Sequence, residues 1–324
     1  MKVWQCDDSR PVPGLTPGTL ENPVPGPGEL LIRIHAVGVT PTELSWYPTT
    51  HTKTGENRQQ AIPGHEFSGV VTATGSGLED SLGSEVFGMN DWFADGATAE
   101  YCCTLPSMVA PKPVRLSHVA AASIPIAALT AWQGLFDRAK LQPGERVLIH
   151  GGSGAVGVLA IQLAHWHGAE VLTTARSSYR ETLMKLGATR VIDYRNERFE
   201  EIAKGVDVVF DPVGGSILQK SWDILGPGGR LITIAASSEE PTDERTKRAF
   251  FIVESNREQL GKIASLLDSG KLHPVVRDVI PFDAARMAYF PSCLQEIGCG
   301  RKVITGSFTN QPQIEFQTPV YRIH

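Results

Sequence analysis

The fold of this chain is decided by one stretch of sequence, Val147-Leu148-Ile149-His150-Gly151-Gly152-Ser153-Gly154-Ala155-Val156-Gly157. An apolar run leads into glycines spaced G-x-x-G-x-x-G, a variant of the usual G-x-G-x-x-G, and a helical pattern follows. Gly151 supplies the unusual φ of a tight strand-to-helix turn. Gly154 lets a phosphate approach the backbone amides at the positive end of the helix dipole, and Gly157 lets the helix pack close to the strand. This context predicts dinucleotide binding, with these loop residues in contact with the cofactor: Gly151, Ser153, Gly154, Ala155, Val156 and Gly157.

Around this loop, residues from about 145 to 275 alternate between apolar runs and helical patterns. Apolar runs separated by helices indicate a parallel sheet that is covered on both faces. The sequence therefore predicts an α/β fold built on a Rossmann-type, doubly wound parallel sheet. The predicted strands are 146–150, 170–174, 190–193, 206–210 and 230–234, and the clearest helical patterns cover 156–164 and 180–186.

The first 115 residues have a different texture, rich in glycine and proline. Runs such as 29–37 and 67–73 alternate at period 2 and are bounded by Pro-Gly turns. This pattern is typical of twisted strands in a barrel-like domain. The strand texture returns after residue 280, with 301–305 as a candidate strand.

These textures predict the domain organisation. We expect residues 1–115 and 280–324 to form one domain and residues 116–279 to form the dinucleotide-binding domain. Two independent domains in series are the alternative. The polar stretch 310–324 fits a tail as well as an additional edge strand.

The end of the second predicted strand bears on the type of cofactor. It reads Val171-Leu172-Thr173-Thr174-Ala175-Arg176-Ser177-Ser178-Tyr179-Arg180 and has no carboxylate to accept hydrogen bonds from an adenosine ribose. Arg176, Ser177 and Arg180 suit a 2′-phosphate instead, because a guanidinium binds phosphate with paired hydrogen bonds. Tyr194, after the third strand, is a further candidate beside the same phosphate. The sequence therefore favours NADPH, the alternative being that both arginines are solvated charges.

Composition excludes several classes of protein. The 324 residues carry 30 Lys and Arg against 35 Asp and Glu, and this net charge of −5 argues against nucleic acid or an anionic membrane as the main partner. No apolar run is long enough to span a membrane, and the first residues do not resemble a signal peptide. Five cysteines form no disulfide framework, so we expect a cytoplasmic protein.

Three segments together resemble the medium-chain dehydrogenase/reductase superfamily, in its zinc-free quinone oxidoreductase branch. They are Gly64-His65-Glu66-Phe67-Ser68-Gly69-Val70-Val71, the junction from Ala120 to Trp132, and the glycine loop. The resemblance covers about residues 1 to 308. It implies a GroES-like β-barrel domain beside the Rossmann domain, and an NADPH-dependent oxidoreductase.

The zinc enzymes of this superfamily differ from this chain at the positions of their metal ligands. Where they have a cysteine after Gly-Val, this chain has Thr40; the histidine is kept as His65, and Ile126 stands at the third position. A catalytic zinc needs about three protein ligands. The four-cysteine structural lobe is also missing. We therefore expect no metal, and substrates that accept hydride without one, namely quinones and α,β-unsaturated carbonyls.

The resemblance also implies which residues surround the nicotinamide. Thr40 takes the place of the cysteine ligand and faces the ring, and Thr130 lies near the ribose. Tyr47 is the best candidate for an acid or an oxyanion donor, although aromatic side chains more often only fill cores. The loops after the fourth and fifth strands and the segment that follows them are expected to line the ring through Val213, Ile234, Ala235, Ala236, Phe251 and Ile252.

Two other functions and one assembly remain open. The chain could be an NADPH-binding protein with little turnover, crystallin-like or regulatory, or a regulator that uses the adjacent thiols of Cys102 and Cys103. The run Arg248-Ala249-Phe250-Phe251-Ile252-Val253-Glu254 predicts a sixth strand at the sheet edge. Such an edge can pair with its twin across a two-fold axis, so we expect a homodimer.

Overall fold

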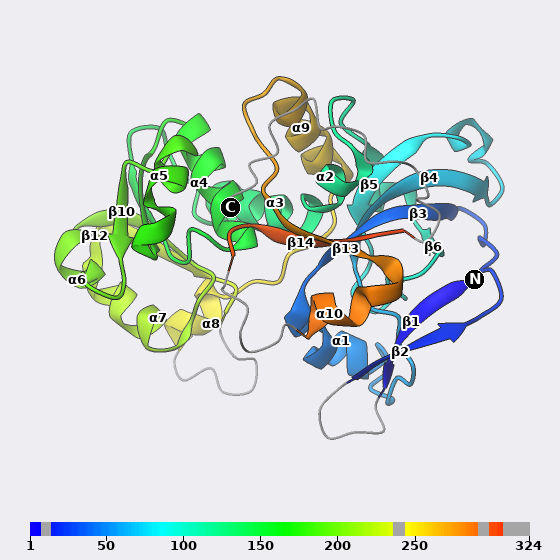
Figure 1. The fold of residues 1–324 in the computed structure, drawn as a ribbon. Helices are drawn as coiled ribbons and strands as arrows, with labels where there is room; N and C mark the ends of the chain where they lie inside the picture. Colours follow the sequence, from blue (N-terminus) through cyan, green and yellow to red (C-terminus); the bar gives the residue numbers. More distant parts are fainter. Residues whose placement is uncertain (8–13, 236–243, 291–297, 307–324) are drawn as a thin grey trace.

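The computed structural model describes residues 1–7, 14–235, 244–290 and 298–306. The chain forms two lobes that lie side by side, one containing β8 to β12 and the other containing β1 to β7 with β13 and β14 (Figure 1). Helix α3 (Pro125–Trp132) lies between them and packs against α4, α9 and β5. In the part of the chain described, no helix is long and apolar enough to cross a membrane.

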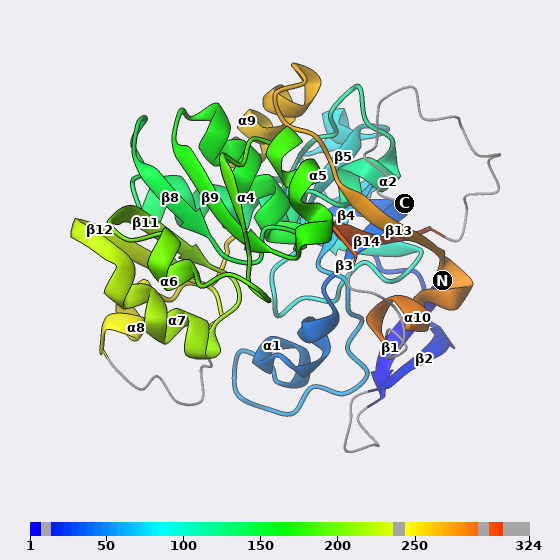
Figure 2. The ribbon, with the colours of Figure 1, turned by 60° about the vertical axis from the view of Figure 1, so that its left-hand side comes forward.

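The first lobe is a parallel sheet in the order β10-β9-β8-β11-β12 (Figure 2). Every pair of neighbouring strands runs parallel. Its strands are β8 (Arg146–Ile149), β9 (Glu170–Ala175), β10 (Arg190–Asp193), β11 (Val206–Asp211) and β12 (Leu225–Thr233), and its helices are α4 (Ala155–Trp166), α5 (Arg180–Lys185), α6 (Phe199–Ile202), α7 (Gly215–Ser221), α8 (Glu244–Ala249) and α9 (Arg257–Asp268).

Alternate residues of each strand enter different hydrophobic clusters on the two faces of this sheet. Val147 and Ile149 pack with α3, α4 and α9, whereas Leu148 packs with α6 and α7. Both faces of the strands are thus buried, which explains their continuous apolar runs. This arrangement confirms the predicted doubly wound parallel sheet.

The second lobe is built on a mostly antiparallel sheet in the order β13-β14-β3-β4-β5-β7. The long strand β3 also pairs with β6 through its first half, while β14 pairs with its second half. A separate hairpin of β1 and β2 packs beside it. The elements are β1 (Lys2–Asp7), β2 (Gly14–Thr19), β3 (Leu30–Val39), α1 (Tyr47–Thr50), β4 (Glu66–Thr74), β5 (Glu85–Met89), β6 (Tyr101–Thr104), β7 (Val109–Pro111), α2 (His118–Ala122), β13 (Val276–Pro281), α10 (Ala285–Tyr289) and β14 (Arg301–Thr305).

The predicted sixth strand at 248–254 is wrong. Helix α8 continues to Ala249, and Phe250 forms only one isolated parallel bridge, to Thr233 of β12. Beyond it the backbone pairs with side chains instead of a strand: Val253 accepts from the Trp92 indole at 3.0 Å, and the Gln133 amide pairs with both backbone groups of Glu254. Distant side chains therefore satisfy the groups that a ladder would have used.

The Gln133 contact depends on an unusual helix. Residues Gln133–Arg138 form a π-helix that continues α3, and this geometry is common at functional sites. It places Gly134 against the Phe210 ring, where a Cβ atom would lie 2.6 Å from Cε2. The wider turn thus lets the backbone approach the sheet while Gln133 reaches the segment after α8.

Candidate active site

The glycine loop joins β8 to α4 as predicted. Gly151 has a φ of +61°, and Gly157 lies so close to the loop that a Cβ atom would meet the Gly151 carbonyl oxygen at 2.3 Å. Gly154 is different, because it caps α4, is exposed, and has only that same oxygen 3.2 Å from a built Cβ. The fold needs glycine at Gly151 and Gly157, while Gly154 keeps the helix N-terminus open to a phosphate.

The second lobe touches this loop directly. The backbone N–H of Gly300 donates to the Ser153 carbonyl at 3.0 Å. Gly300 has a φ of +87°, and a Cβ atom there would lie 2.2 Å from the Val275 carbonyl oxygen. Only glycine fits this position, so the contact between the lobes depends on it.

The ends of β9 and β10 bring together some of the predicted phosphate residues. The Arg176 Nε atom donates to the Tyr194 hydroxyl at 3.2 Å. Ser177 instead forms a hydrogen bond to Asp193, which lowers the pKa of that carboxyl after larger contributions from Asn196 and the Arg195 N–H. Arg180 pairs with Glu197 at 3.3 Å. A hydrogen bond thus joins Arg176 to Tyr194, and Arg180 is paired with a carboxylate.

The loops after β11 and β12 meet at Asp211, which the sequence did not single out as a site residue. Its buried carboxylate accepts the N–H groups of Val213 and Gly214 at 2.9 and 3.0 Å. Burial raises the pKa of Asp211, and these hydrogen bonds oppose the shift. An Asp just after a strand and before Pro-Val-Gly is the signal for such a turn. Through it, Val213 lies near Gly151, within 3.0 Å of a built Cβ.

The remaining residues predicted to surround the nicotinamide differ in their exposure. Ile234 and Ala235 follow β12 and are half-buried, whereas Ala236 lies outside the described residues. Phe251 is buried under the Arg138 guanidinium, while Ile252 is 61% exposed. Thr130 is buried and donates its hydroxyl to the Ile126 carbonyl at 2.6 Å. The Thr130 hydroxyl can therefore only accept a hydrogen bond from a ribose.

Thr40 is half-buried and lies at the end of a polar chain that starts on β14. Arg301 Nη1 donates to the Thr40 hydroxyl oxygen at 2.9 Å, and Arg301 Nε lies 2.7 Å from a carboxylate oxygen of Glu66. The other Glu66 oxygen accepts the Ile126 N–H at 2.9 Å. Burial raises the pKa of Glu66 to about 7, and Arg301 is the main group that opposes it. The guanidinium therefore favours the charged carboxylate.

The positions of the zinc ligands do not fit a catalytic zinc. His65 is buried, with Nδ1 2.8 Å from the Glu43 carboxylate and Nε2 3.3 Å from the Ala94 carbonyl oxygen. Thr40 receives the Arg301 hydrogen bond, and Ile126 has no donor atom in its side chain. Among the described residues, no three His, Cys, Asp or Glu side chains lie close enough to hold a metal ion.

Aromatic rings gather beside His65. Trp92 lies 5.2 Å from the His65 ring and 5.1 Å from the Trp46 ring, measured between centroids, and its indole N–H reaches Val253. Tyr47 does not join this cluster by any described ring contact: it stacks on His51 at 4.4 Å and is 56% exposed. Trp92 is therefore the aromatic residue that spans both lobes.

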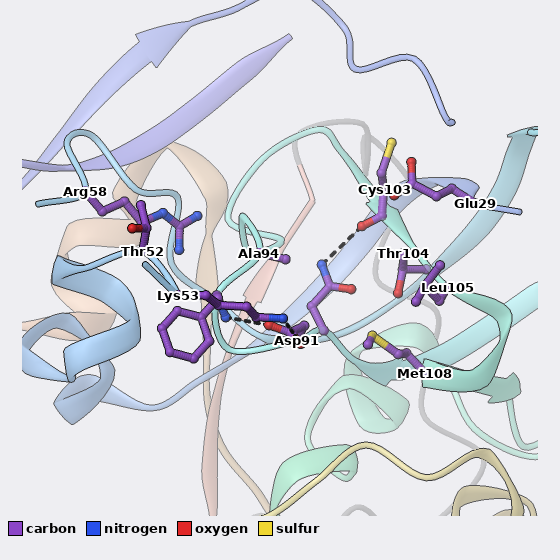
Figure 3. Close-up of a pocket in the computed structure, with 12 residues that line it drawn as sticks. Glu29, Thr52, Lys53, Arg58, Asp91, Ala94, Cys103, Thr104, Leu105 and Met108 are labelled. Carbon is purple, nitrogen blue, oxygen red and sulfur yellow. Dashed lines mark hydrogen bonds and ion pairs between the residues drawn. The ribbon is translucent and has the colours of Figure 1, made fainter. Parts of the chain in front are cut away.

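A separate cavity of about 390 Å³ lies on the second lobe (Figure 3). Ion pairs join the polar segment after α1 to the loop after β5: Lys53 to Asp91 at 3.0 Å, and Arg58 to Asp95 at 2.6 Å. Charges of both signs line the cavity, so it has no single electrostatic preference for a ligand. It is lined by Glu29, Thr52, Lys53, Arg58, Asn90, Asp91, Phe93, Ala94, Cys103, Thr104, Leu105 and Met108.

The environments of the adjacent thiols on β6 disfavour the thiolate form. Burial raises the pKa of Cys102 well above the usual range, and burial with Glu29 raises the pKa of Cys103 to about 11. The thiolate is the reactive form of cysteine. These environments argue against the thiol-dependent regulator.

Family models match both lobes of the chain. The alcohol dehydrogenase GroES-like domain matches residues 26–114, and the zinc-binding dehydrogenase model matches residues 186–290. The chain is 34% identical over 297 residues to 2-methylene-furan-3-one reductase of Solanum lycopersicum, covering 87% of this chain and 73% of that protein. It is 31% identical to the chloroplastic NADPH-dependent alkenal/one oxidoreductase of Arabidopsis thaliana, covering 94% and 79%.

A solved structure agrees with these relatives. The quinone oxidoreductase of Coxiella burnetii superposes with a TM-score of 0.83 at 30% identity, covering 94% of this chain and 99% of that one. The predicted GroES-like domain is confirmed by the family match. The fold, the glycine loop and these relatives together show that the chain is an oxidoreductase of the medium-chain dehydrogenase/reductase superfamily, in its quinone oxidoreductase branch.

Proposed function

We propose that this protein is an NADPH-dependent, zinc-independent reductase of quinones or α,β-unsaturated carbonyls. The observation that carries the cofactor is the Arg176–Tyr194 pair at the end of β9, where an NAD enzyme has a carboxylate. Two donors at that place suit a 2′-phosphate. The names of the relatives, which act on an enone, an alkenal or a quinone, support the substrate class.

Bound NADPH would supply a hydride ion from its nicotinamide. In an enone, that hydride forms a C–H bond at the β-carbon, the π pair of the C=C bond shifts to join the α-carbon to the carbonyl carbon, and the carbonyl π pair moves onto the oxygen as an enolate. A proton from water or a side chain then adds to the α-carbon, and the C=O bond of the saturated ketone forms again. The protein's part is to align the acceptor and to donate a hydrogen bond to the oxygen that gains charge. We assign that donor to Thr40, since its hydroxyl oxygen is held by Arg301.

Zinc independence rests on the donor set at the three ligand positions. Only His65 is a residue type that usually binds zinc, and both of its ring nitrogens already face oxygen atoms. Protein purified without added zinc should hold far less than one equivalent by elemental analysis, and its activity should survive a strong chelator. A stoichiometric, activity-linked zinc would exclude this part of the proposal.

Cofactor titration tests the main proposal. Fluorescence quenching should give at least tenfold tighter binding of NADPH than of NADH, and Arg176→Ala should remove most of that difference while NADH binding stays unchanged. Arg198→Ala is the control, because Arg198 is exposed in the same lobe and pairs only with Glu201 among its described contacts. Equal dissociation constants for the two cofactors in the unmodified protein would refute the assignment.

Turnover separates an enzyme from a binding protein. NADPH oxidation is followed with a naphthoquinone and with a short alkenal. Tight NADPH binding without turnover on either acceptor would instead favour the NADPH-binding protein with little catalysis.

We also propose that the protein is a cytoplasmic homodimer. Because the run 248–254 is not a strand, β12 is the terminal strand on that side of the sheet among the described residues, so we assign the pairing element to β12 in place of the predicted seam. Sedimentation at micromolar concentration tests this assembly, and a monomer would exclude it.

A further inference from the structure

Arg301 is a buried cation that contacts three groups distant in the sequence. It is 7% exposed, and its Nε atom lies 2.7 Å from Glu66, which is fully buried. Its Nη1 atom donates to the Thr40 hydroxyl oxygen at 2.9 Å and to the Val39 carbonyl at 3.3 Å. Burying a guanidinium is costly, and here the cost is offset by the ion pair with Glu66 and by the two hydrogen bonds of Nη1. Among the described residues, Nε and Nη2 make no hydrogen bond of good geometry, so Nη1 is the atom that orients the Thr40 hydroxyl.

The groups around Arg301 also contact α3 and the glycine loop of the first lobe. Glu66 accepts the N–H of Ile126 in the first turn of α3. The neighbouring residue, Gly300, donates to the Ser153 carbonyl in the glycine loop at 3.0 Å. The guanidinium is therefore located relative to the loop expected to hold the pyrophosphate, and not only within its own sheet.

The direction of the hydrogen bond determines what Thr40 can do. Arginine only donates, so the Thr40 oxygen accepts and keeps its own O–H. Within the described ranges, that O–H has no acceptor at hydrogen-bond distance. Accepting from a cation also polarises the hydroxyl and makes it a stronger donor to a third group.

We propose that Arg301 is a positioning residue for Thr40, holding the hydroxyl so that it donates to the substrate oxygen that becomes negative during hydride transfer. This inference rests on the proposed function for the identity of the substrate. Glu66 forms an ion pair with the guanidinium through Nε and so helps to hold it in place. Thr40 is the catalytic residue, and Arg301 acts only through it.

A double-mutant cycle tests whether Arg301 works through Thr40. Thr40→Val should lower kcat about 10²-fold, as expected for loss of one oxyanion donor, with the NADPH dissociation constant unchanged. Arg301→Met should lower kcat to a similar degree, and Thr40→Val/Arg301→Met should be no worse than the more damaging single variant. Multiplying losses would mean independent roles and would overturn the inference, as would unchanged kcat in Thr40→Val.

Companion variants separate positioning from folding. Thr40→Ser keeps the hydroxyl and should recover most of the loss seen in Thr40→Val. Arg301→Lys keeps the charge but cannot reach Glu66 and Thr40 at once, so it should lower kcat even where Arg301→Met fails to fold. Thr305→Val, on the same strand, is the matched control and should retain kcat. An Arg301→Lys variant with full kcat would contradict the proposal.

A binding measurement distinguishes this inference from the proposed function. The probe is 2-hydroxy-1,4-naphthoquinone, whose anionic oxygen at neutral pH resembles the developing charge, added to the protein with NADP⁺. Thr40→Val and Arg301→Met should weaken its binding by the same factor, without a further loss in the double variant. If the variants show this pattern but the unmodified protein turns over neither acceptor, the proposed function fails, and the coupling of Arg301 to Thr40 in binding an anionic oxygen stands. If the unmodified protein turns over acceptors while neither variant weakens the probe, the inference alone fails.

Discussion

We expect His150, which follows β8, to make the stability of the first lobe depend on pH. Its ring is fully buried, with Nδ1 3.1 Å from the Thr174 hydroxyl and Nε2 2.9 Å from the Ser221 hydroxyl. The same Thr174 oxygen accepts the N–H of Gly151, so His150 supports the glycine loop. Burial lowers the pKa of His150 from 6.5 to about 4. The folded protein therefore favours the neutral ring.

The size of the effect follows from that difference in pKa. Above about pH 6.5 the His150 ring is neutral in the unfolded chain as well, so the free energy of unfolding has its full value there. It falls as the pH is lowered towards 4. For a shift from 6.5 to about 4, the free energy of unfolding decreases by about 2 kcal/mol at pH 5 and about 3 kcal/mol at pH 4. Lowering the pH from 7 towards 4 should thus remove, through His150 alone, a substantial part of the stability of an ordinary domain.

The assay compares urea unfolding at pH 7 and pH 5 for the unmodified protein and for His150→Gln. Glutamine keeps polar atoms beside Thr174 and Ser221 but does not titrate. The decrease in unfolding free energy between the two pH values should therefore be about 2 kcal/mol smaller in the variant. The comparison cancels other groups, such as His118, whose pKa is also lowered to about 4 by burial and His35. Equal decreases in both proteins would refute the reasoning.

Three further substitutions test the glycine loop, the stability of α9 and the contact between the lobes. Gly154→Ala should leave the melting temperature nearly unchanged but weaken NADPH at least tenfold by titration, because the added methyl occupies the approach to the helix N-terminus; unchanged affinity would contradict this. Gly261→Ala, inside α9 where a Cβ atom meets nothing within 4 Å, should stabilise the protein by about 0.5–1 kcal/mol in urea unfolding without changing NADPH affinity. Trp92→Phe should cost about 1–2 kcal/mol in the same measurement, because the Val253 carbonyl loses its indole partner; a stable variant would show that this hydrogen bond does not hold the lobes together.

The sequence predicts what depends on local order and misses what depends on distant partners. The strands at 190–193 and 301–305 match β10 and β14 residue for residue, because period and turn residues are local properties. The run 248–254 has the same β-type composition but is not a strand, since Trp92 and Gln133 occupy its backbone groups. No pattern in the sequence predicts that Trp92 and Gln133 contact this run.

The candidate site shows the same division. The sequence predicts the glycine loop, because the backbone constraint on each glycine comes from residues close to it in the chain. Thr40 was found only as the substitute for a cysteine ligand. Its partner Arg301 was not found, because the two residues are 261 positions apart and are joined only when β14 pairs with β3. The role of Tyr47 stays a prediction, as its ring stacks on His51 rather than on Trp92.

The pairing of β3 with β14 has a consequence for synthesis of the protein. During translation, the first half of β3 finds β6 after some seventy residues, but the half from Ala36 to Val39 waits for residues 302–305. At about 5–20 residues per second, that interval lasts on the order of tens of seconds. The nascent chain therefore carries an open, apolar strand edge while the entire cofactor lobe is made, which is a risk for aggregation at the ribosome. The hydrogen bond from Arg301 to Thr40 joins β14 to the end of β3, so it cannot form before this part of the sheet has closed.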